Sequence, residues 1–246
     1  MTTMMKRALI NYAFRLCIFL FILGAYIFHK EILVGFMTHE FTFGISEYGI
    51  SPLHVLWGVF MLMMLQHIFP NKYLSMAYRK GDIKGYEEVE GHSRLELLEF
   101  VQGMNAKAWM VMLAWLSFNA LFAVLYLFKV IDAGDMLMLT VFFYLSDYIC
   151  ILFFCPFQSL IMHNKCCINC RIYDWGYFMM FTPMLFIKNF FSWSLFFTAL
   201  IILIKWEVNY AKHPERFWFG SNKKLQCVNC KEKLCVLKNR RKNERV

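Results

Sequence analysis

Charged residues are scarce in this 246-residue chain. Asp, Glu, Lys and Arg make up only 17% of it, while 59% of its residues are hydrophobic. A soluble domain carries about a quarter charged residues, so the composition excludes a domain with an ordinary aqueous surface. Several windows of roughly twenty nearly uncharged residues are long enough to cross a bilayer as helices. The sequence therefore predicts an all-α, polytopic integral membrane protein built as a helical bundle.

The chain also lacks the motifs of several large enzyme classes. It contains no Gly-rich phosphate-binding loop, no nucleophile elbow, no zincin motif and no dinucleotide-binding fingerprint. No long-period repeat and no low-complexity tract is present. These absences leave any reaction unassigned and direct attention to the cysteines, the histidines and the ionisable residues within apolar segments.

Six of the nine cysteines gather in two short motifs beside basic residues. Residues 167–171 and 227–231 both read Cys, β-branched aliphatic, Asn, Cys, cation. Two such Cys-x-x-Cys motifs supply the four soft thiolates that a tetrahedral zinc ion or an iron–sulfur cluster requires. If the basic segments face the cytoplasm, the thiols lie in a reducing compartment, which favours metal binding over disulfides. The predicted metal ligands are Cys166, Cys167, Cys170, Cys227, Cys230 and Cys235.

Three interpretations of these cysteines remain open: structural zinc, an iron–sulfur cluster and metal-free redox thiols. The near-symmetry of the two motifs favours zinc, held by Cys167, Cys170, Cys227 and Cys230. The presence of six thiols rather than four favours a cluster. Either metal centre would attach the C-terminal tail to the end of the fourth apolar span.

Four histidines lie at the ends of apolar spans. His29 and His54 share the predicted outer level, and His67 and His163 share the inner level. Two histidine pairs at two levels would suit two b-type haems. However, the thirteen residues between His54 and His67 rotate a helix by about 1300°, so the two rings point some 140° apart. This angle favours ordinary interfacial histidines over haem ligands.

Asp147 is the one carboxylate deep inside a predicted span. An ionisable side chain is costly there and indicates a functional role by default. Asp147 is therefore a candidate to bind a proton or a transported cation, or to pair with Arg15 or His67. The alternative is a protonated acid that hydrogen-bonds a neighbouring Tyr or Ser.

The apolar runs and charge clusters divide the chain into six parts. Residues 93–100 within the second part predict a short amphipathic helix on the inner membrane surface. The parts are 1–70, two spans with an outer loop; 71–107, a cytoplasmic amphipathic loop; 108–163, spans three and four; 164–172, the first cysteine motif; 173–206, a hydrophobic hairpin; and 207–246, a basic tail with the second cysteine motif.

The net charge of +9 comes mostly from the chain ends and loops. The positive-inside rule predicts that both termini are cytoplasmic and that the tail meets anionic inner-leaflet lipid rather than nucleic acid. This orientation needs an even number of crossings, so residues 173–206 are predicted to fold as a hairpin with residues 188–189 at its tip. Each limb has about 15–17 residues, close to the minimum for a ~30 Å bilayer core.

Three functions fit these features. The first is a redox subunit that passes electrons from an iron–sulfur centre to a quinone or haem. The second is an ion or small-solute transporter or channel, with Asp147 in the path and the metal as a structural staple. The third is a non-enzymatic subunit or assembly factor of a membrane complex. A membrane or cytoplasmic protein partner is expected.

Overall fold

A computed structural model describes residues 3–38, 41–42, 49–69, 85–91, 93–164, 166 and 169–230. Within these residues the regular elements are helices, apart from the short antiparallel ladder β1–β2 and an isolated antiparallel bridge between Glu88 and Asn222. The longer elements are α1 (Thr3–Thr38), α2 (Pro52–Ile68), α4 (Arg94–Leu127), α5 (Ala133–Leu152), α6 (Gly176–Phe181) and α7 (Phe190–Lys212). The short ones are β1 (Phe41–Thr42), β2 (Gly49–Ile50), η2 (Phe157–Met162), η3 (Tyr173–Trp175), η4 (Thr182–Phe186), η5 (Pro214–Phe217), η6 (Lys223–Leu225) and η7 (Cys227–Asn229).

Four of these helices are long and apolar enough to span a membrane: α1 over Met5–Leu33, α4, α5 and α7. Helix α2 is apolar but has only 17 residues. The expectation of an all-helical architecture with membrane-length helices is confirmed for the described residues. Helix α2 begins with residue types that favour a helix start, because Ser51 is its N-cap and Pro52 its first residue.

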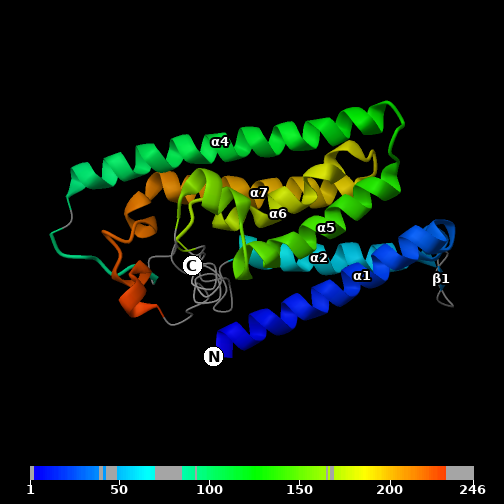
Figure 1. The fold of residues 1–246 in the computed structure, drawn as a ribbon, viewed down its shortest axis with the longest axis horizontal. Coiled ribbons are helices and arrows are strands. Elements are labelled where there is room, and N and C mark those ends of the chain that lie inside the picture. Colours follow the sequence, from blue (N-terminus) through cyan, green and yellow to red (C-terminus); the bar gives the residue numbers. More distant parts are fainter. Residues whose placement is uncertain are drawn as a thin grey trace, which may run out of the picture.

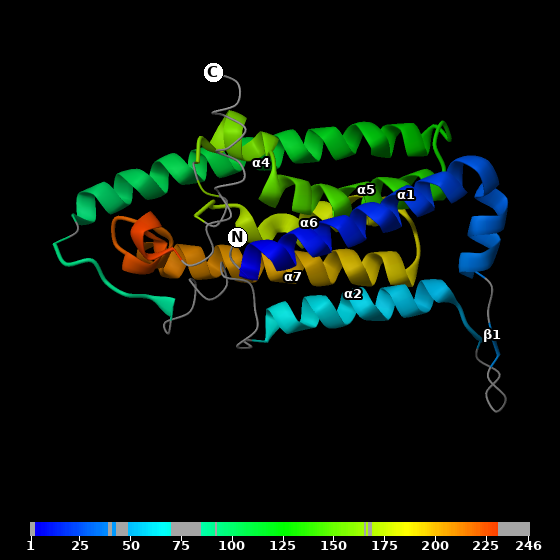
Figure 2. The same ribbon diagram turned by 60° about the horizontal axis from the view of Figure 1, so that its bottom comes forward.

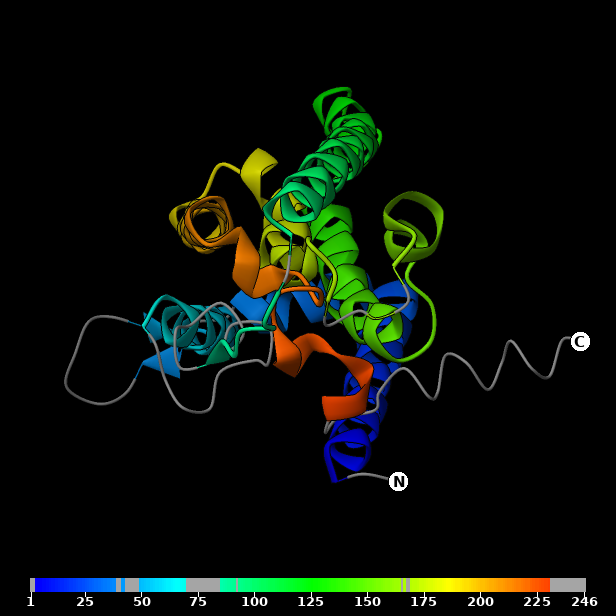
Figure 3. The same cartoon turned by 90° about the vertical axis from the view of Figure 1, so that its left-hand side faces the viewer.

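Six segments run back and forth along the long axis of the molecule (Figure 1). They are α1, α2, α4, α5, the series η3–α6–η4, and α7. Helix α1 therefore begins on the side where α2 and α7 end, and η5 to η7 lie on that side too (Figures 1 and 2). Viewed from this end, α4 and α1 lie on opposite sides of α5 and α6 (Figure 3).

Helix α1 bends at His29, whose backbone leaves the helical region with φ −143° and ψ 47°. The residues after the bend turn away from the bundle (Figure 2). Two contacts attach the bend to the turn between α4 and α5. Lys30 Nζ lies 2.5 Å from Asp132 Oδ2, and the Tyr26 hydroxyl donates to Asp135 Oδ1 at 2.6 Å.

Helix α4 corrects the prediction for residues 93–107. A separate amphipathic helix over 93–100 and a loop to residue 107 were expected, but residues 94–127 form one helix. No proline interrupts this stretch. At 1.5 Å per residue the helix is about 50 Å long, well beyond the ~30 Å apolar core of a bilayer. Its polar first turns extend past the bundle, where Phe100 stacks on Trp218 with 5.8 Å between ring centroids.

Helix α5 corrects the predicted extent of the fourth span. Spans three and four were expected to fill residues 108–163, but α5 ends at Leu152 and the π-helical turn η2 follows at Phe157–Met162. Pro156 explains the break. Its ring would clash with the carbonyl of Leu152, and its nitrogen has no hydrogen to donate to that carbonyl.

The apolar segment 173–206 folds back on itself. Its first limb is the series η3–α6–η4, and the limb packs along α7. The reversal lies at residues 187–189 and includes the predicted tip at residues 188–189. Asn189 caps α7 by accepting a hydrogen bond from the Phe191 backbone N–H at 3.1 Å. The limb also contacts α4, where Trp115 Nε1 donates to Thr182 Oγ1 at 3.1 Å.

Candidate functional site

A cavity of about 230 Å³ lies among α1, α2, α5 and the first limb of the hairpin. Four ionisable side chains line it, each from a different segment: Arg15 from α1, His67 from α2, Asp147 from α5 and Asp174 from η3. Tyrosines form much of the remaining wall: Tyr144, Tyr148, Tyr173 and Tyr177. We call this space the polar cavity.

Arg15 and Asp147 face each other across the polar cavity. Arg15 Nη1 lies 3.5 Å from Asp147 Oδ2 and donates to the Tyr144 carbonyl oxygen at 2.7 Å. The guanidinium also lies over the rings of Tyr144 and Tyr148, 3.8 and 4.1 Å from their centroids. These cation–π contacts and the carboxylate together compensate a charge that is otherwise costly to hold inside an apolar bundle.

His67 and Asp174 form a second pair. Their closest atoms, His67 Nδ1 and Asp174 Oδ1, are 3.7 Å apart, too far for a hydrogen bond. His67 Nδ1 is buried and has no hydrogen-bond partner among the described residues. The edge of the imidazole packs on Tyr177, with 5.0 Å between ring centroids. Lys205 of α7 lies close to the pair, and its ammonium donates to the Ile68 carbonyl oxygen.

Gly176 brings the hairpin backbone close to Asp147. A Cβ at position 176 would lie 3.2 Å from Asp147 Oδ1, tighter than an ordinary contact. The Asp147 side chain keeps 39% of its surface accessible, whereas the Asp174 side chain keeps 8%. Asp147 is accessible because it faces open space on two sides.

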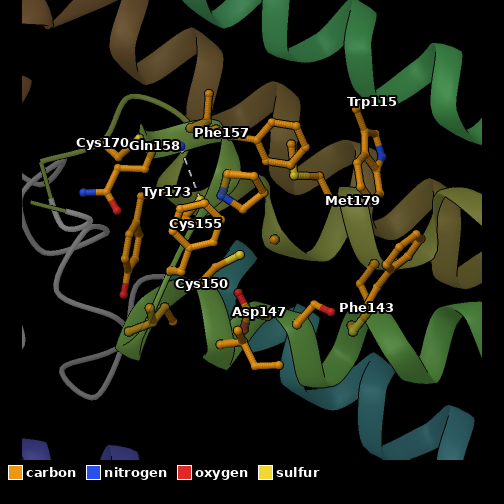
Figure 4. Close-up of a pocket in the computed structure, with 18 of the residues that line it drawn as sticks. Trp115, Phe143, Asp147, Cys150, Cys155, Phe157, Gln158, Cys170, Tyr173 and Met179 are labelled. Carbon is orange, nitrogen blue, oxygen red and sulfur yellow. Dashed lines mark hydrogen bonds between the residues drawn. The ribbon is translucent and has the colours of Figure 1, made fainter. Parts of the chain in front are cut away.

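The second space is a larger cavity of about 570 Å³ between α4, α5 and α6, which we call the apolar cavity. Asp147 lines this cavity as well as the polar one. Figure 4 shows Trp115, Phe157 and Tyr173 around the apolar cavity, with Asp147 on the side formed by α5. Asp147 therefore stands in the wall that the two cavities share.

The predicted cysteine centre is only partly described. Cys167 and Cys235 lie outside the described residues, while Cys170 is buried, Cys227 is exposed, and Cys166 and Cys230 are half-buried. The two motifs lie in the same region, because Asn169 Nδ2 donates to the Leu225 carbonyl oxygen at 3.0 Å. Among the described residues, no three Cys, His, Asp or Glu side chains are grouped so that they could hold a metal ion. A cysteine metal centre stays a prediction.

Arg171, which follows the first cysteine motif, anchors this region to α7. The guanidinium binds both carboxylate oxygens of Glu207, with 2.7 Å between Nη1 and Oε1. Trp175 Nε1 donates to the same carboxylate at 2.8 Å, and Trp206 Nε1 donates to the Arg171 carbonyl oxygen at 2.9 Å. The Arg171 guanidinium lies 3.6 Å from the Tyr210 ring centroid. Sequence reasoning treated Arg171 only as a cation beside thiols and missed this structural network.

The four histidines proposed as haem ligands have different surroundings. His29 is at the bend of α1, and His54 is the third residue of α2, with its Nδ1 2.7 Å from the N-cap hydroxyl of Ser51. His163 is exposed, with its Nδ1 2.9 Å from the Ile161 carbonyl oxygen. Only His67 lines either of the two cavities described above. Neither of these two cavities is lined by a pair of histidines, and haem binding stays a prediction.

Sequence reasoning identified Asp147 but missed Asp174 and Gly176 as its neighbours. Asp174 was assigned to the end of an apolar segment, where a carboxylate is unremarkable. A signal was nevertheless present, since residues 173–177 place one carboxylate and one glycine among three aromatic residues. His67 was singled out for haem and as a possible partner of Asp147, whereas its described partner is Asp174.

The fold and the cavities define an all-helical protein with four candidate membrane-spanning helices and an ionisable cluster inside the bundle. Comparison of the chain with protein-family models, curated proteins and solved structures finds no match. Any function must therefore be argued from the cavities themselves.

Proposed function

We propose that the protein is an integral membrane transporter in which Asp147 lies in the transport path and binds a proton or a small cation. One observation carries the proposal: four ionisable side chains from four segments converge on a single cavity between apolar helices. Ionisable residues at such positions are costly and mark ion paths and proton relays.

A purely structural role accounts for only part of the cluster. Arg15 and Asp147 alone would make a neutral pair that joins α1 to α5. The second carboxylate, Asp174, and the histidine beside it add desolvation cost without a hydrogen bond between them. Because this second pair gains no hydrogen bond to offset that cost, a functional role accounts for it better than a structural one.

The second pair is suited to proton exchange. A proton on His67 Nδ1 would give the ring a donor that faces Asp174 Oδ1, and a small movement would shorten the 3.7 Å gap to a charge-assisted hydrogen bond. Asp147 lines the same cavity and carries the accessible carboxylate. In this proposal protons pass between the His67–Asp174 pair and Asp147, while Arg15 and Lys205 supply the compensating positive charges.

The cysteine motifs act as a cytoplasmic staple in this proposal. The Asn169–Leu225 hydrogen bond supports it by holding the chain next to the second motif against the first. Both termini are then cytoplasmic, and the basic tail lies at the anionic inner leaflet. The cysteines of the two motifs would bind zinc or an iron–sulfur cluster. Iron at this site would favour electron transfer over transport.

Proton flux through reconstituted vesicles tests the proposal. Purified protein is incorporated into vesicles that contain a pH-sensitive dye, and a potassium diffusion potential drives proton entry. Wild-type protein is expected to raise the rate above that of protein-free vesicles. Asp147→Asn should lower this extra rate by about tenfold or more, as expected for loss of an obligatory intramembrane site. Glu99→Gln is the matched control, because Glu99 is an exposed carboxylate on α4.

The control should transport at the wild-type rate. Unchanged size-exclusion elution of Asp147→Asn separates loss of transport from loss of folding. Wild-type vesicles no faster than protein-free vesicles, or a folded Asp147→Asn protein with full activity, would contradict the proposal.

A further inference from the structure

The apolar cavity differs chemically from the polar one. Its walls are aromatic and aliphatic side chains, together with a few neutral polar groups and thiols. Asp147 is the only Asp, Glu, Lys or Arg among the described residues that line it. Its volume of about 570 Å³ falls in the range of cavities that bind drug-sized organic molecules.

This lining excludes most ligand classes. Arg15 lines the polar cavity but not the apolar one, so an anion in the apolar cavity would meet the Asp147 carboxylate in the wall and no cation to bind it. A sugar-like ligand would leave most of its hydroxyls without partners against an apolar wall. An uncharged lipid would fit the wall and leave the carboxylate unused.

We infer that the apolar cavity binds a lipophilic organic cation, with its positive charge at Asp147 and its apolar groups against the rings of Trp115, Phe143 and Phe157. The inference rests on the proposed transporter function and names its substrate class. Carboxylates attract cations by charge, and aromatic faces attract them through the ring quadrupole. Both features line this one cavity.

The rim of the apolar cavity provides an entry route. Phe118, Phe142 and Phe154 line the apolar cavity, and each of these residues is between 43% and 55% exposed. These residues belong to α4, α5 and the segment that follows α5, whose outward faces are apolar. A lipophilic cation dissolved in the bilayer would therefore reach the cavity laterally, between α4 and α5.

The shared wall links cation binding to the ion site. Arg15 approaches Asp147 from the polar cavity and contacts Oδ2 at a loose 3.5 Å. A ligand cation in the apolar cavity would approach the same carboxylate from the other side. The ligand cation, a proton and Arg15 thus compete for one charge, and this competition would couple cation movement to proton movement.

Binding of tetraphenylphosphonium to the wild-type protein in detergent tests the inference without any variant. The control ion is tetraphenylborate, which has the same shape and the opposite charge. Radiolabelled ligand is measured by equilibrium dialysis against protein-free micelles. Saturable binding of the phosphonium alone is expected. Equal binding of both ions, or saturable binding of neither, would overturn the inference.

Two carboxylate variants test which carboxylate binds the cation. Asp147→Asn should weaken phosphonium binding by about tenfold or more, which corresponds to about 1.4 kcal/mol. Asp174→Asn should leave it within about threefold, since Asp174 lines only the polar cavity. Equal loss in both variants would refute binding at Asp147.

The two proposals fail separately. If phosphonium does not bind but proton flux still depends on Asp147, the substrate class is wrong and the transporter proposal stands. If phosphonium binds at Asp147 but no flux depends on this residue, the cavity is a binding site and the transporter proposal falls.

Discussion

At the scale of single residues, the candidate site depends on how closely Gly176 approaches Asp147. The hairpin and α5 meet here with no side chain between the glycine and the carboxylate. The carboxylate position is therefore set by backbone packing as well as by Arg15. A larger residue at position 176 would displace Asp147 without removing its charge.

We predict that Gly176→Ala lowers proton flux by about threefold to tenfold, because the new methyl group would lie 3.2 Å from Asp147 Oδ1. The vesicle flux measurement checks this. Gly103→Ala on α4 is the control, since a Cβ at that position would meet no neighbouring group within 4 Å. Wild-type flux from Gly176→Ala would show that the close approach has no functional role.

Asp132, in the turn between α4 and α5, makes a pH-dependent contribution to stability. The hydrogen bond from Lys30 holds the pKa of the Asp132 carboxyl below its usual value. A lowered folded-state pKa adds stability at pH values above the unfolded pKa, and this stability is lost as the pH falls through the folded pKa. Because Asp132 is largely exposed, the contribution stays below about 1 kcal/mol.

We predict that Asp132→Asn lowers the melting temperature slightly at neutral pH. The difference from wild type should narrow as the pH falls toward about 3. Asparagine still caps a helix, so the variant removes the charge and keeps the cap of α5. A difference that stays constant across this pH range would rule out the charge as its cause.

At the scale of elements, the sequence predicted the positions of the helices better than their ends. The hairpin tip was predicted at residues 188–189, where a polar pair marks it, and the chain reverses at 187–189. The start of α4 was missed, because an amphipathic stretch keeps the same period whether it lies on a membrane or continues into a span. The end of α5 was missed because the apolar run continues past Pro156.

The direction of the elements yields a labelling prediction. The element η7, which contains Cys227, and the turn between α4 and α5, which contains Lys129, lie at opposite ends of the long axis of the molecule (Figure 1). If the tail is cytoplasmic, a membrane-impermeant maleimide should modify Cys227 only after permeabilisation and removal of any bound metal.

The matched variant is Lys129→Cys, at an exposed position in the turn between α4 and α5. It should react in intact cells, and mass spectrometry assigns the modified thiol in both cases. Modification of Cys227 in intact cells would overturn both the orientation and the cytoplasmic staple.

At the scale of the whole molecule, only part of the site was visible in the sequence. Asp147 stands out because it is the single carboxylate deep in its span. The convergence of His67 and Asp174 depends on the packing of α2 and the hairpin around the polar cavity, which leaves no local signal. The apolar cavity likewise depends on the distance between α4 and α5. The hydrophobic periodicity of each helix does not predict this distance.

The metal prediction also concerns the whole molecule, since the cysteines would join the tail to the bundle. We predict about one zinc per chain, held by four thiolates, and a melting temperature that falls when a strong chelator removes it. Elemental analysis and a visible spectrum of protein purified without oxygen check this. Iron with acid-labile sulfide would make the centre an iron–sulfur cluster and favour the redox function. A metal-free protein would refute the staple.

Difference infrared spectroscopy on the reconstituted protein tests the central claim most directly, because it detects the protonation of individual carboxyl groups. If Asp147 exchanges protons inside the bundle, a pH change should produce a carboxylic acid band that is present in wild type and Glu99→Gln and absent in Asp147→Asn. A wild-type spectrum without such a band, or one that Asp147→Asn leaves unchanged, would contradict Asp147 as the proton-binding residue.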